Sequence, residues 1–174
     1  MPLLRKHSVK SSPLCGQKGP FMKAVLTRVR SASVSIDGEL HGSIGQGFLI
    51  LLGIAPEDTP ESCRKLAEKC LGLRIFRDEN DKMNRSLADV GGSVLVVSQF
   101  TLYGDTKKGY RPSFIKAARA PLAVDAYELF LAEMAKHGLK DVQHGEFGAH
   151  MQVSLVNEGP CTIIIDTDEW KKKE

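Results

Sequence analysis

The sequence predicts a mixed α/β domain in which β-sheet layers, arranged as a sandwich or barrel-like structure, pack against two main helices. Two segments, residues 58–71 and 121–136, carry apolar residues at helical spacing. Short runs rich in Val, Ile and Leu surround them, as is typical of buried strands. The 174 residues, 42% of them hydrophobic, suit one domain with a core of its own.

The domain is expected to start at Met22, where a sustained apolar pattern begins. We predict an unstructured N-terminal extension over residues 1–21 and a single domain over residues 22–170. The extension is basic, lacks acidic residues and contains three serines. A misassigned start, an expression remnant and an organellar targeting segment all stay open as its origin. A cytoplasmic protein is the main expectation, and targeting by residues 1–21 is the minor one.

The first elements follow from turn and cap signals. Val34 to Ile36 and Glu39 to His41 flank Asp37-Gly38, a two-residue turn that predicts a hairpin. Gly47 to Ile54 then predicts a buried strand.

A helix is expected next, capped by Asp58 or Thr59 and carrying Pro60 in its first turn. Its apolar face is predicted to lie in the core and consists of Cys63, Leu66, Ala67, Cys70 and Leu71.

The polar segment from Arg77 to Gly92 is expected to form a surface loop. Asp78, Asn80 and Asp81 in this segment slightly resemble a calcium-binding loop. The required glycine and distal glutamate are missing, so a solvated turn is the better interpretation.

The second half predicts a strand over Val94 to Val97, a helix over Pro121 to Lys136 ended by Gly138, and further strands. Met151 to Val156 and Thr162 to Asp166 are expected to be separate strands on either side of Gly159-Pro160. A fixed turn or a cis peptide is plausible at this Gly-Pro bond, and the sequence does not choose between cis and trans.

Charge and cysteine spacing exclude several classes of protein. The first 22 residues hold four basic residues and no acid, which leaves 20 basic and 21 acidic residues in the rest of the chain. A strongly basic nucleic-acid scaffold is therefore excluded, although a pocket for one RNA end needs only a few local charges. The four cysteines show no zinc or disulfide spacing, and no cofactor or metal is predicted. No apolar run approaches the roughly 20 residues that would span a bilayer, so we expect no membrane partner.

The familiar catalytic motifs are missing from the chain. There is no GxSxG, HExxH, Walker or GxGxxG sequence in a suitable setting, and the histidines at 137, 144 and 150 have no ligand spacing. Ser98 and Thr101, at the end of the Val94 to Val97 run, lack a neighbouring base that could make either hydroxyl a nucleophile. The alternative is a site built from main-chain groups that stabilise an oxyanion and orient a water.

Two basic features keep two interpretations each. Arg28 is either an exposed strand arginine or a charge partner near a pocket or an RNA phosphate. The loop from Lys107 to Pro112 is either a solvated loop or a contact to a backbone phosphate.

Five ordered segments closely resemble the D-aminoacyl-tRNA deacylases, the D-tyrosyl-tRNA(Tyr) deacylase family that frees tRNA mischarged with a D-amino acid. The resemblance spans Met22 to about Asp166. The segments are Lys23 to Val34, Gly91 to Leu102 (GGSVLVVSQFTL), Arg111 to Phe114 (RPSF), Phe147 to Met151 (FGAHM) and Asn157 to Thr162 (NEGPCT). The one notable departure is Cys161, where valine is common in the family.

The resemblance implies a homodimer whose pocket is completed across the interface. The Ser98 to Leu102 segment of one subunit would meet Gly159-Pro160 of the other. In that family the Gly-Pro bond is cis, and its carbonyls occupy the space that an L side chain would need. Achiral glycine would not be well excluded, so activity on mischarged glycyl-tRNA is also implied.

The implied reaction is hydrolysis of the ester between the amino acid and the terminal adenosine of tRNA, a proofreading step in translation quality control. Main-chain groups near Phe100 and Thr101, with the substrate's ribose hydroxyl, would catalyse it. The remaining site residues would be Ser98, Gln99, Phe147 and Met151 for substrate binding, Gly159 and Pro160 for L-amino-acid rejection, and Arg28, Asn157 and Thr162 as supports.

Two rival functions remain at this stage. A non-catalytic nucleic-acid-binding dimer would keep the fold, but it would be expected to carry a long basic extension. A related deacylase class acts on L-alanine attached to the wrong tRNA and relaxes the Gly-Pro geometry. The intact Asn157 to Thr162 segment favours the D-specific class.

Overall fold

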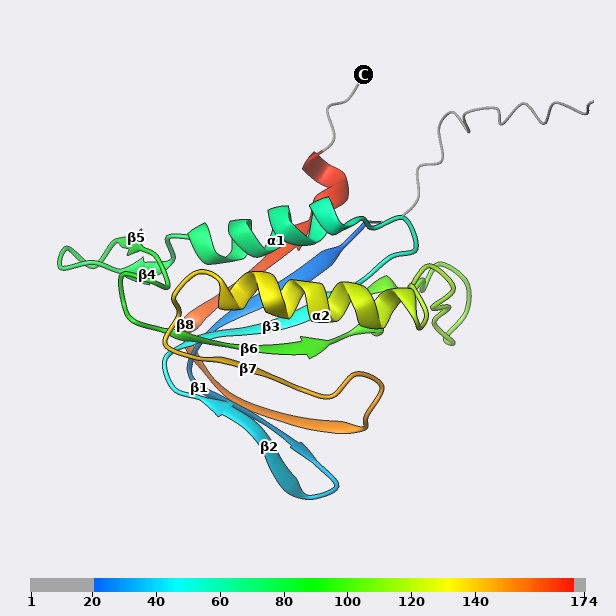
Figure 1. Cartoon of the computed structure of the whole chain (residues 1–174), viewed down its shortest axis with the longest axis horizontal. Helices are drawn as coiled ribbons and strands as arrows, with labels where there is room; N and C mark the ends of the chain where they lie inside the picture. The colour runs from blue at the N-terminus through cyan, green and yellow to red at the C-terminus, as the bar shows by residue number, and fades with distance from the viewer. Residues whose placement is uncertain (1–20, 171–174) are drawn as a thin grey trace, which may run out of the picture.

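The computed structural model describes residues 21–170, and the predicted extension therefore lies, except for Phe21, outside the described residues. The strands and helices follow one another as β1 (Lys23–Ile36), β2 (Glu39–Ile44), β3 (Gly47–Gly53), α1 (Pro60–Gly72), β4 (Phe76–Arg77), β5 (Met83–Arg85), β6 (Ser93–Ser98), η1 (Phe100–Tyr103), α2 (Leu122–Ala135), β7 (Val142–His144), β8 (Met151–Asp166) and η2 (Thr167–Trp170). The predicted α/β class with two main helices is confirmed. Both helices lie on one face of a curved sheet (Figure 1).

The main sheet is organised around β1. Its strands follow the order β2-β1-β3-β6-β7, and β8 pairs with β1 on the other side. The first half of β1 pairs with β3 and the second half with β2, while β8 runs antiparallel along nearly its whole length. Because β3, β6 and β7 are parallel neighbours and β1 is antiparallel to β3, the sheet is mixed.

Side chains of the central strands alternate between two cores. Phe48, Ile50 and Val96 pack under the helices with Leu66 and Phe130. The neighbouring positions on the same strands point to the opposite face. There they form a smaller cluster that consists of Val29, Ala32, Val34, Ile44, Leu49, Leu95 and Val97. The strands β1, β2 and β8 curve over this second cluster, which gives the sheet its barrel-like shape (Figure 1).

Local chemistry explains the boundaries of the early elements. Asp37 and Gly38 have φ values of 53° and 82°, so the predicted two-residue turn joins β1 to β2. Thr59 caps α1: its hydroxyl accepts the N–H of Ser62, and the Ser62 hydroxyl accepts the N–H of Thr59. The predicted burial of Cys63 and Cys70 on this helix is also confirmed.

Two expectations about the strands were wrong. The segment from Arg77 to Gly92 is more than a loop, because β4 and β5 form a short hairpin and Leu87 is fully buried in the core. The carboxylate of Asp78 accepts the N–H groups of Asn80 and Lys82, which makes the predicted solvated turn at the hairpin tip. The strands on either side of Gly159-Pro160 are one continuous strand, β8, which bulges at this point.

Within residues 21–170, no helix is long and apolar enough to cross a membrane.

Candidate functional site

A four-residue bulge in β8 presents Gly159 and Pro160 to the solvent. Thr27 pairs with Thr162 and Val29 with Asn157, so Arg28 alone on β1 faces residues 158–161 on β8. The extra residues cannot join the ladder and protrude from it. The side-chain carbonyl of Asn157 accepts the N–H of Cys161 at 3.2 Å and closes the base of the bulge. Thr162 resumes the ladder, and its hydroxyl lies 3.5 Å from that of Thr27.

Arg28 supports this bulge from below. Its side chain is buried, with 3% of the residue exposed. The Nε group donates to the carbonyl of Glu158 at 2.9 Å, and Nη1 donates to the carbonyl of Ile75. The guanidinium thereby ties the bulge to the segment that enters β4. A charged group at this depth needs such acceptors. The interpretation of Arg28 as an exposed strand arginine is therefore wrong.

Gly159 fits the bulge because it has no side chain. Its φ is 133°, a conformation that L side chains rarely adopt. A Cβ atom at this position would meet the Nη2 atom of Arg28. The peptide bond from Gly159 to Pro160 is cis, which answers the question that the sequence left open.

The second candidate segment begins where β6 ends. Ser98 pairs with Leu52, and the N–H of Gln99 donates to the carbonyl of Leu52 at 2.7 Å. The chain then enters the single 3₁₀ turn η1, in which Phe100 and Thr101 are exposed. The first N–H groups of a helical turn have no partner inside it. In the described part of the chain, the N–H groups of Phe100 and Thr101 make no backbone hydrogen bond outside the turn.

Thr101 has no base beside it. Its hydroxyl accepts a hydrogen bond from the side-chain amide of Gln99, and no other side-chain hydrogen bond to it is found among residues 21–170. An amide cannot take up a proton at neutral pH. The local chemistry therefore agrees with the sequence analysis that this hydroxyl is not activated as a nucleophile.

An apolar hollow of about 450 Å³ lies beside η1. Phe100 and Phe147 both line it, so two predicted site residues meet here although they are far apart in sequence. Phe114 also lines it and packs edge-on against Phe100, with ring centroids 5.3 Å apart. Sequence analysis matched Phe114 within a motif but gave it no role, because only the fold brings its ring to Phe100.

Tyr127 anchors the loop that carries Phe147. Its hydroxyl is within hydrogen-bond distance of the carbonyls of Val96 (2.9 Å) and Gly145 (3.2 Å), and its ring lies 6.0 Å from that of Phe147. Burial raises the pKa of the Tyr127 hydroxyl, so this group stays protonated and serves as a structural donor. Met151, a predicted binding residue, instead packs against the second core cluster and does not line this hollow.

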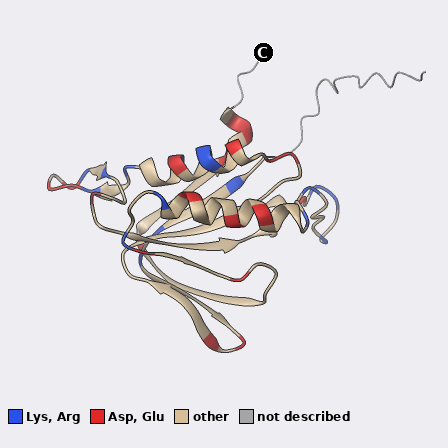
Figure 2. Ribbon diagram, in the orientation of Figure 1, with Lys and Arg blue, Asp and Glu red and all other residues tan. Residues whose placement is uncertain are grey.

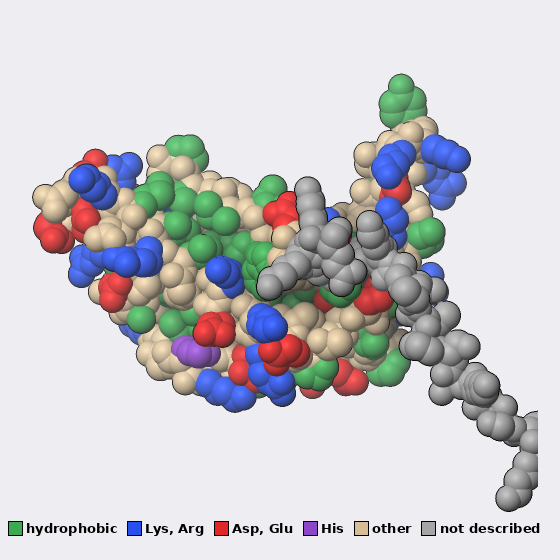
Figure 3. Space-filling model, turned by 90° about the horizontal axis from the view of Figure 1, so that it is seen from above, with side chains coloured by type: hydrophobic (Ala, Val, Ile, Leu, Met, Phe, Trp, Pro, Cys, Tyr) green, Lys and Arg blue, Asp and Glu red, His purple; other side chains and the backbone are tan. Residues whose placement is uncertain are grey.

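A basic loop projects beside η1. Residues 105–113 form a closed loop because the backbones of Asp105 and Ser113 exchange hydrogen bonds of 2.8 and 3.0 Å. Lys107, Lys108 and Arg111 are exposed on it, and the loop stands out from the body at this end of the molecule (Figures 2 and 3). Hydrogen bonds from the N–H of Lys107 and the ammonium of Lys116 hold the pKa of Asp105 below its usual value.

The two candidate segments lie at different places on the sheet. Arg28, which faces the bulge, pairs with Phe48 on β3, and Phe48 in turn pairs with Val94 on β6. Ser98 lies four residues further along β6. Two strands, β1 and β3, also separate β8 from β6. Strand geometry therefore places the bulge and Ser98 ~13 Å apart along the strands and ~14 Å apart across them. One chain alone does not bring all predicted site residues into one pocket.

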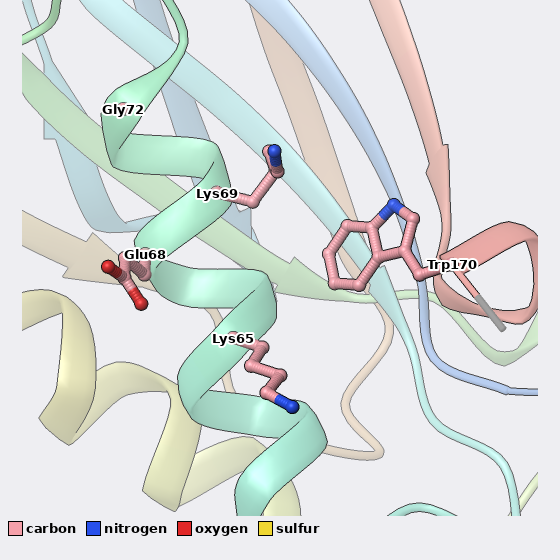
Figure 4. Close-up of a pocket in the computed structure, with 5 residues that line it drawn as sticks. All are labelled: Lys65, Glu68, Lys69, Gly72 and Trp170. Carbon is pink, nitrogen blue, oxygen red and sulfur yellow. The ribbon is translucent and has the colours of Figure 1, made fainter. Parts of the chain in front are cut away.

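A further hollow, of about 550 Å³, lies between α1 and Trp170 (Figure 4). Lys65 and Lys69 line it, and the ammonium of Lys69 lies 5.9 Å from the centre of the indole ring. None of the predicted site residues belongs to it.

Among residues 21–170, no three His, Cys, Asp or Glu side chains come together as they would in a metal site.

The chain is similar to known proteins over most of its length. The family model described as D-Tyr-tRNA(Tyr) deacylase matches residues 25–166. The chain is 54% identical to the D-aminoacyl-tRNA deacylase of Desulfatibacillum aliphaticivorans, over 84% of this chain and 99% of that protein. It is 53% identical to the D-aminoacyl-tRNA deacylase of Thermus aquaticus, over 85% of this chain and 97% of that one.

Two solved structures share the fold. A c-Myc DNA unwinding element binding protein superposes with a TM-score of 0.77 at 41% identity, over 82% of this chain and 97% of that one. A probable eukaryotic D-amino acid tRNA deacylase superposes with a TM-score of 0.72 over 83% and 98%, and at 18% identity it supports the fold alone. From these matches, and above all from the relatives more than half identical over nearly their whole length, the chain belongs to the D-Tyr-tRNA(Tyr) deacylase family.

Proposed function

We propose that this protein hydrolyses the ester bond of D-aminoacyl-tRNA and releases the free D-amino acid and tRNA. The observation that carries the proposal is the combination of two exposed elements, the Gly159-Pro160 bulge and the η1 turn, in a chain 54% identical to a D-aminoacyl-tRNA deacylase. Lys107, Lys108 and Arg111 beside η1 give the local positive charge that an RNA substrate requires, although the domain as a whole is nearly neutral.

The active unit in this proposal is a homodimer. The bulge and η1 are too far apart within one chain to grip the same aminoacyl group, and a second copy would bring the bulge of one subunit to η1 of the other. The exposed apolar side chains Leu155, Val156 and Ile164 on β8 support an interface along this strand. Among residues 21–170, strand β8 pairs only with β1, so its other edge is open to a partner.

Catalysis is assigned to main-chain groups of η1. The N–H groups of Phe100 and Thr101 are free to donate to the oxygen of the ester carbonyl as it becomes negatively charged. A water attacks the carbonyl carbon, assisted by the neighbouring ribose hydroxyl of the substrate. The bond between this carbon and the ribose oxygen then breaks, and the ribose oxygen takes up a proton. Thr101 does not form a covalent intermediate in this scheme.

Substrate contacts are divided between the two ends of the pocket. Ser98 and Gln99 would bind the terminal adenosine, while Phe100 and Phe147 would supply apolar surface from the hollow beside η1. Met151 is kept as a binding residue only if the partner subunit shifts it from the second core cluster, where it packs.

Chiral selection is assigned to the bulge. Its rigid carbonyls would fill the space on one side of the α-carbon, where an L side chain would point. Three supports would hold it there: the hydrogen bond from Arg28 to Glu158, the hydrogen bond within the bulge to Asn157, and the return to the ladder at Thr162. A D side chain would point away from the bulge, and glycine would have no side chain to reject. Hydrolysis of mischarged glycyl-tRNA follows from the same geometry.

A second candidate function is sequence-dependent or general DNA binding without catalysis. The specific observation in its favour is the 41% identity to a protein described as a c-Myc DNA unwinding element binding protein. The deacylase proposal is favoured because the more similar relatives, at 53–54% identity, are named deacylases.

The experiment that separates the two functions compares amino acid release from D-Tyr-tRNA and L-Tyr-tRNA. Rapid release from the D substrate alone supports the deacylase. Release from neither, with a folded dimer that binds duplex DNA, supports the second candidate.

A further inference from the structure

An arginine-rich hollow borders the bulge at Glu158. Its volume is about 610 Å³, within the range of small-molecule sites. Four arginines line it, from β1 and from the β4–β5 hairpin: Arg28 and Arg30 on β1, Arg77 on β4 and Arg85 on β5. Only two carboxylates share the lining, those of Asp89 and Glu158, so the hollow is net positive.

The arginines differ in how far their charge is already balanced. Arg30 pairs with Glu158 at 3.1 Å, and Arg77 pairs with Asp81 at 2.5 Å. Arg85 donates to the carbonyl of Asp89 at 3.4 Å and makes no ion pair in the described part of the chain. Exposed ion pairs of this kind are weak and exchange readily with other anions. The hollow therefore keeps donors available for a ligand with several oxygens.

We propose that this hollow binds a backbone phosphate of the RNA strand that carries the amino acid. The inference rests on the proposed function, because it is the bulge that would face the aminoacylated end of the RNA. Glu158 and Arg28 belong both to the bulge and to the hollow. A strand whose last residue lies at the bulge passes this surface, and its next phosphates come within reach of Arg77 and Arg85. Planar guanidinium groups match phosphate oxygens in pairs.

The test is the double variant Arg77→Gln and Arg85→Gln in the full chain. Both side chains are on the surface hairpin β4–β5, and neither reaches the core, so the fold is kept. A matched control, Arg64→Gln with Lys65→Gln, removes the same charge from α1, where both residues pair with Glu61 and Arg64 also pairs with Glu133 of α2. The ligand for the binding measurement is an RNA minihelix that ends in CCA and carries no amino acid.

Two measurements distinguish a failure of the proposed phosphate site from a failure of the proposed reaction. The hairpin variant should bind the minihelix about tenfold more weakly, and the slope of log affinity against log salt should fall by about one to two. Its hydrolysis of D-tyrosyl-adenosine, which has no phosphodiester, should equal that of the wild type. If the wild type hydrolyses no D-aminoacyl ester at all, the proposed function fails. The binding comparison still tests whether the hollow binds an RNA phosphate.

A second variant makes the opposite prediction. Glu158→Gln removes the carboxylate that competes for Arg30, so the minihelix should bind more tightly than it does to the wild type. Equal binding by wild type and hairpin variant overturns the proposal. So does equal weakening in the α1 control, since charge alone would then explain the effect. Loss of D-tyrosyl-adenosine hydrolysis in the hairpin variant overturns it as well, because a phosphate contact cannot act on that substrate.

Discussion

The side chain of Arg28 occupies the space that a Cβ atom on residue 159 would need, so the arginine of β1 and the glycine of the β8 bulge fit each other. The contact crosses the bulge between the Thr27–Thr162 and Val29–Asn157 pairs, where the register of β1 and β8 shifts. Arg28 therefore does two things at once: it holds the bulge by the carbonyl of Glu158 and it prevents residue 159 from carrying a side chain.

Gly159→Ala should destabilise the protein by about 1–3 kcal/mol, because the new Cβ meets Arg28 and the φ of 133° is unfavourable for alanine. Since the bulge must shift to admit the methyl group, deacylation of D-Tyr-tRNA should also fall. Urea unfolding and single-turnover hydrolysis measure the two effects. Gly72→Ala is the matched control, as its Cβ meets nothing within 4 Å. Equal stability of the two variants would show that the Arg28 side chain moves aside without a cost in unfolding free energy.

Arg28→Lys should cost about 2–4 kcal/mol of unfolding free energy. The single ammonium of lysine cannot donate to both the Glu158 and Ile75 carbonyls as the guanidinium of arginine does, so one buried carbonyl loses its donor. Arg30→Lys is the control, because its side chain is 74% exposed and loses only a surface pair. A difference below about 0.5 kcal/mol between the two variants would contradict the supporting role of Arg28.

Phe100→Pro should lower kcat about 10²- to 10³-fold relative to Phe100→Ala, since the proline removes one proposed oxyanion donor and the alanine keeps it. Residue 100 begins η1, a position that favours proline, and the preceding Gln99 lies outside the helical region that proline disfavours for its neighbour, with φ of −141° and ψ of 77°. Steady-state hydrolysis of D-Tyr-tRNA gives the comparison. Similar kcat values for the two variants would remove this N–H from the mechanism.

Thr101→Ala completes this series. The substitution removes only the hydrogen bond from Gln99, so kcat should change by less than about tenfold and far less than activity changes on loss of Gly159-Pro160. Complete loss of activity in a correctly folded dimer would restore the hydroxyl as nucleophile.

Mixed dimers test whether the pocket is shared. A Phe100→Pro subunit keeps an intact bulge, and a Gly159→Ala subunit keeps an intact η1. Co-refolding the two impaired variants should give a mixture with about a quarter of wild-type activity from shared pockets alone, because half of the dimers then contain one fully native pocket. No recovery, with heterodimers verified by mass spectrometry, would mean that each chain builds its own site.

The buried thiols predict a fall in stability at high pH. Burial raises the pKa of Cys63 from 9.0 to about 11 and that of Cys70 to about 12. Between pH 9 and 11 the unfolded state therefore loses thiol protons that the folded state retains, so the free energy of unfolding decreases as pH rises. Tyr103 and Tyr127, whose pKa values burial also raises, act in the same direction at higher pH.

Cys63→Ala isolates the contribution of one thiol. Its urea-unfolding free energy should decline less steeply from pH 9 to pH 11 than that of the wild type, whatever its value at pH 7. Parallel curves would show that Cys63 is not responsible.

Local chemistry explains what the sequence could predict. The turn at Asp37 and Gly38 and the cap of α1 at Asp58 or Thr59 depend on neighbouring residues; the turn was predicted correctly, and Thr59 is the cap of the two that were expected. Gly159-Pro160 was expected to divide two strands. It does not, because Arg28 donates a hydrogen bond to the carbonyl of Glu158 and so allows β8 to bulge and then continue. Such compensation comes from a residue 131 positions away and leaves no local signal.

The candidate site shows the same limit. The segments at Ser98 to Leu102 and Asn157 to Thr162 were found as motifs, but the packing of Phe114 on Phe100 and the meeting of Arg77 and Arg85 with β1 depend on the fold. Met151 was placed near the site by resemblance, and in the single chain it packs in the second core cluster. Sheet register also separates the two motifs, which local sequence patterns do not reveal.

The most direct measurement is the rate of amino acid release from D-Tyr-tRNA and L-Tyr-tRNA, side by side, with a chelator present. A chiral deacylase that uses main-chain donors should release D-tyrosine rapidly, leave L-Tyr-tRNA intact and be unaffected by the chelator. Equal release of both enantiomers would contradict selection by the Gly159-Pro160 bulge, and release of neither by a folded dimer would contradict the deacylase function itself.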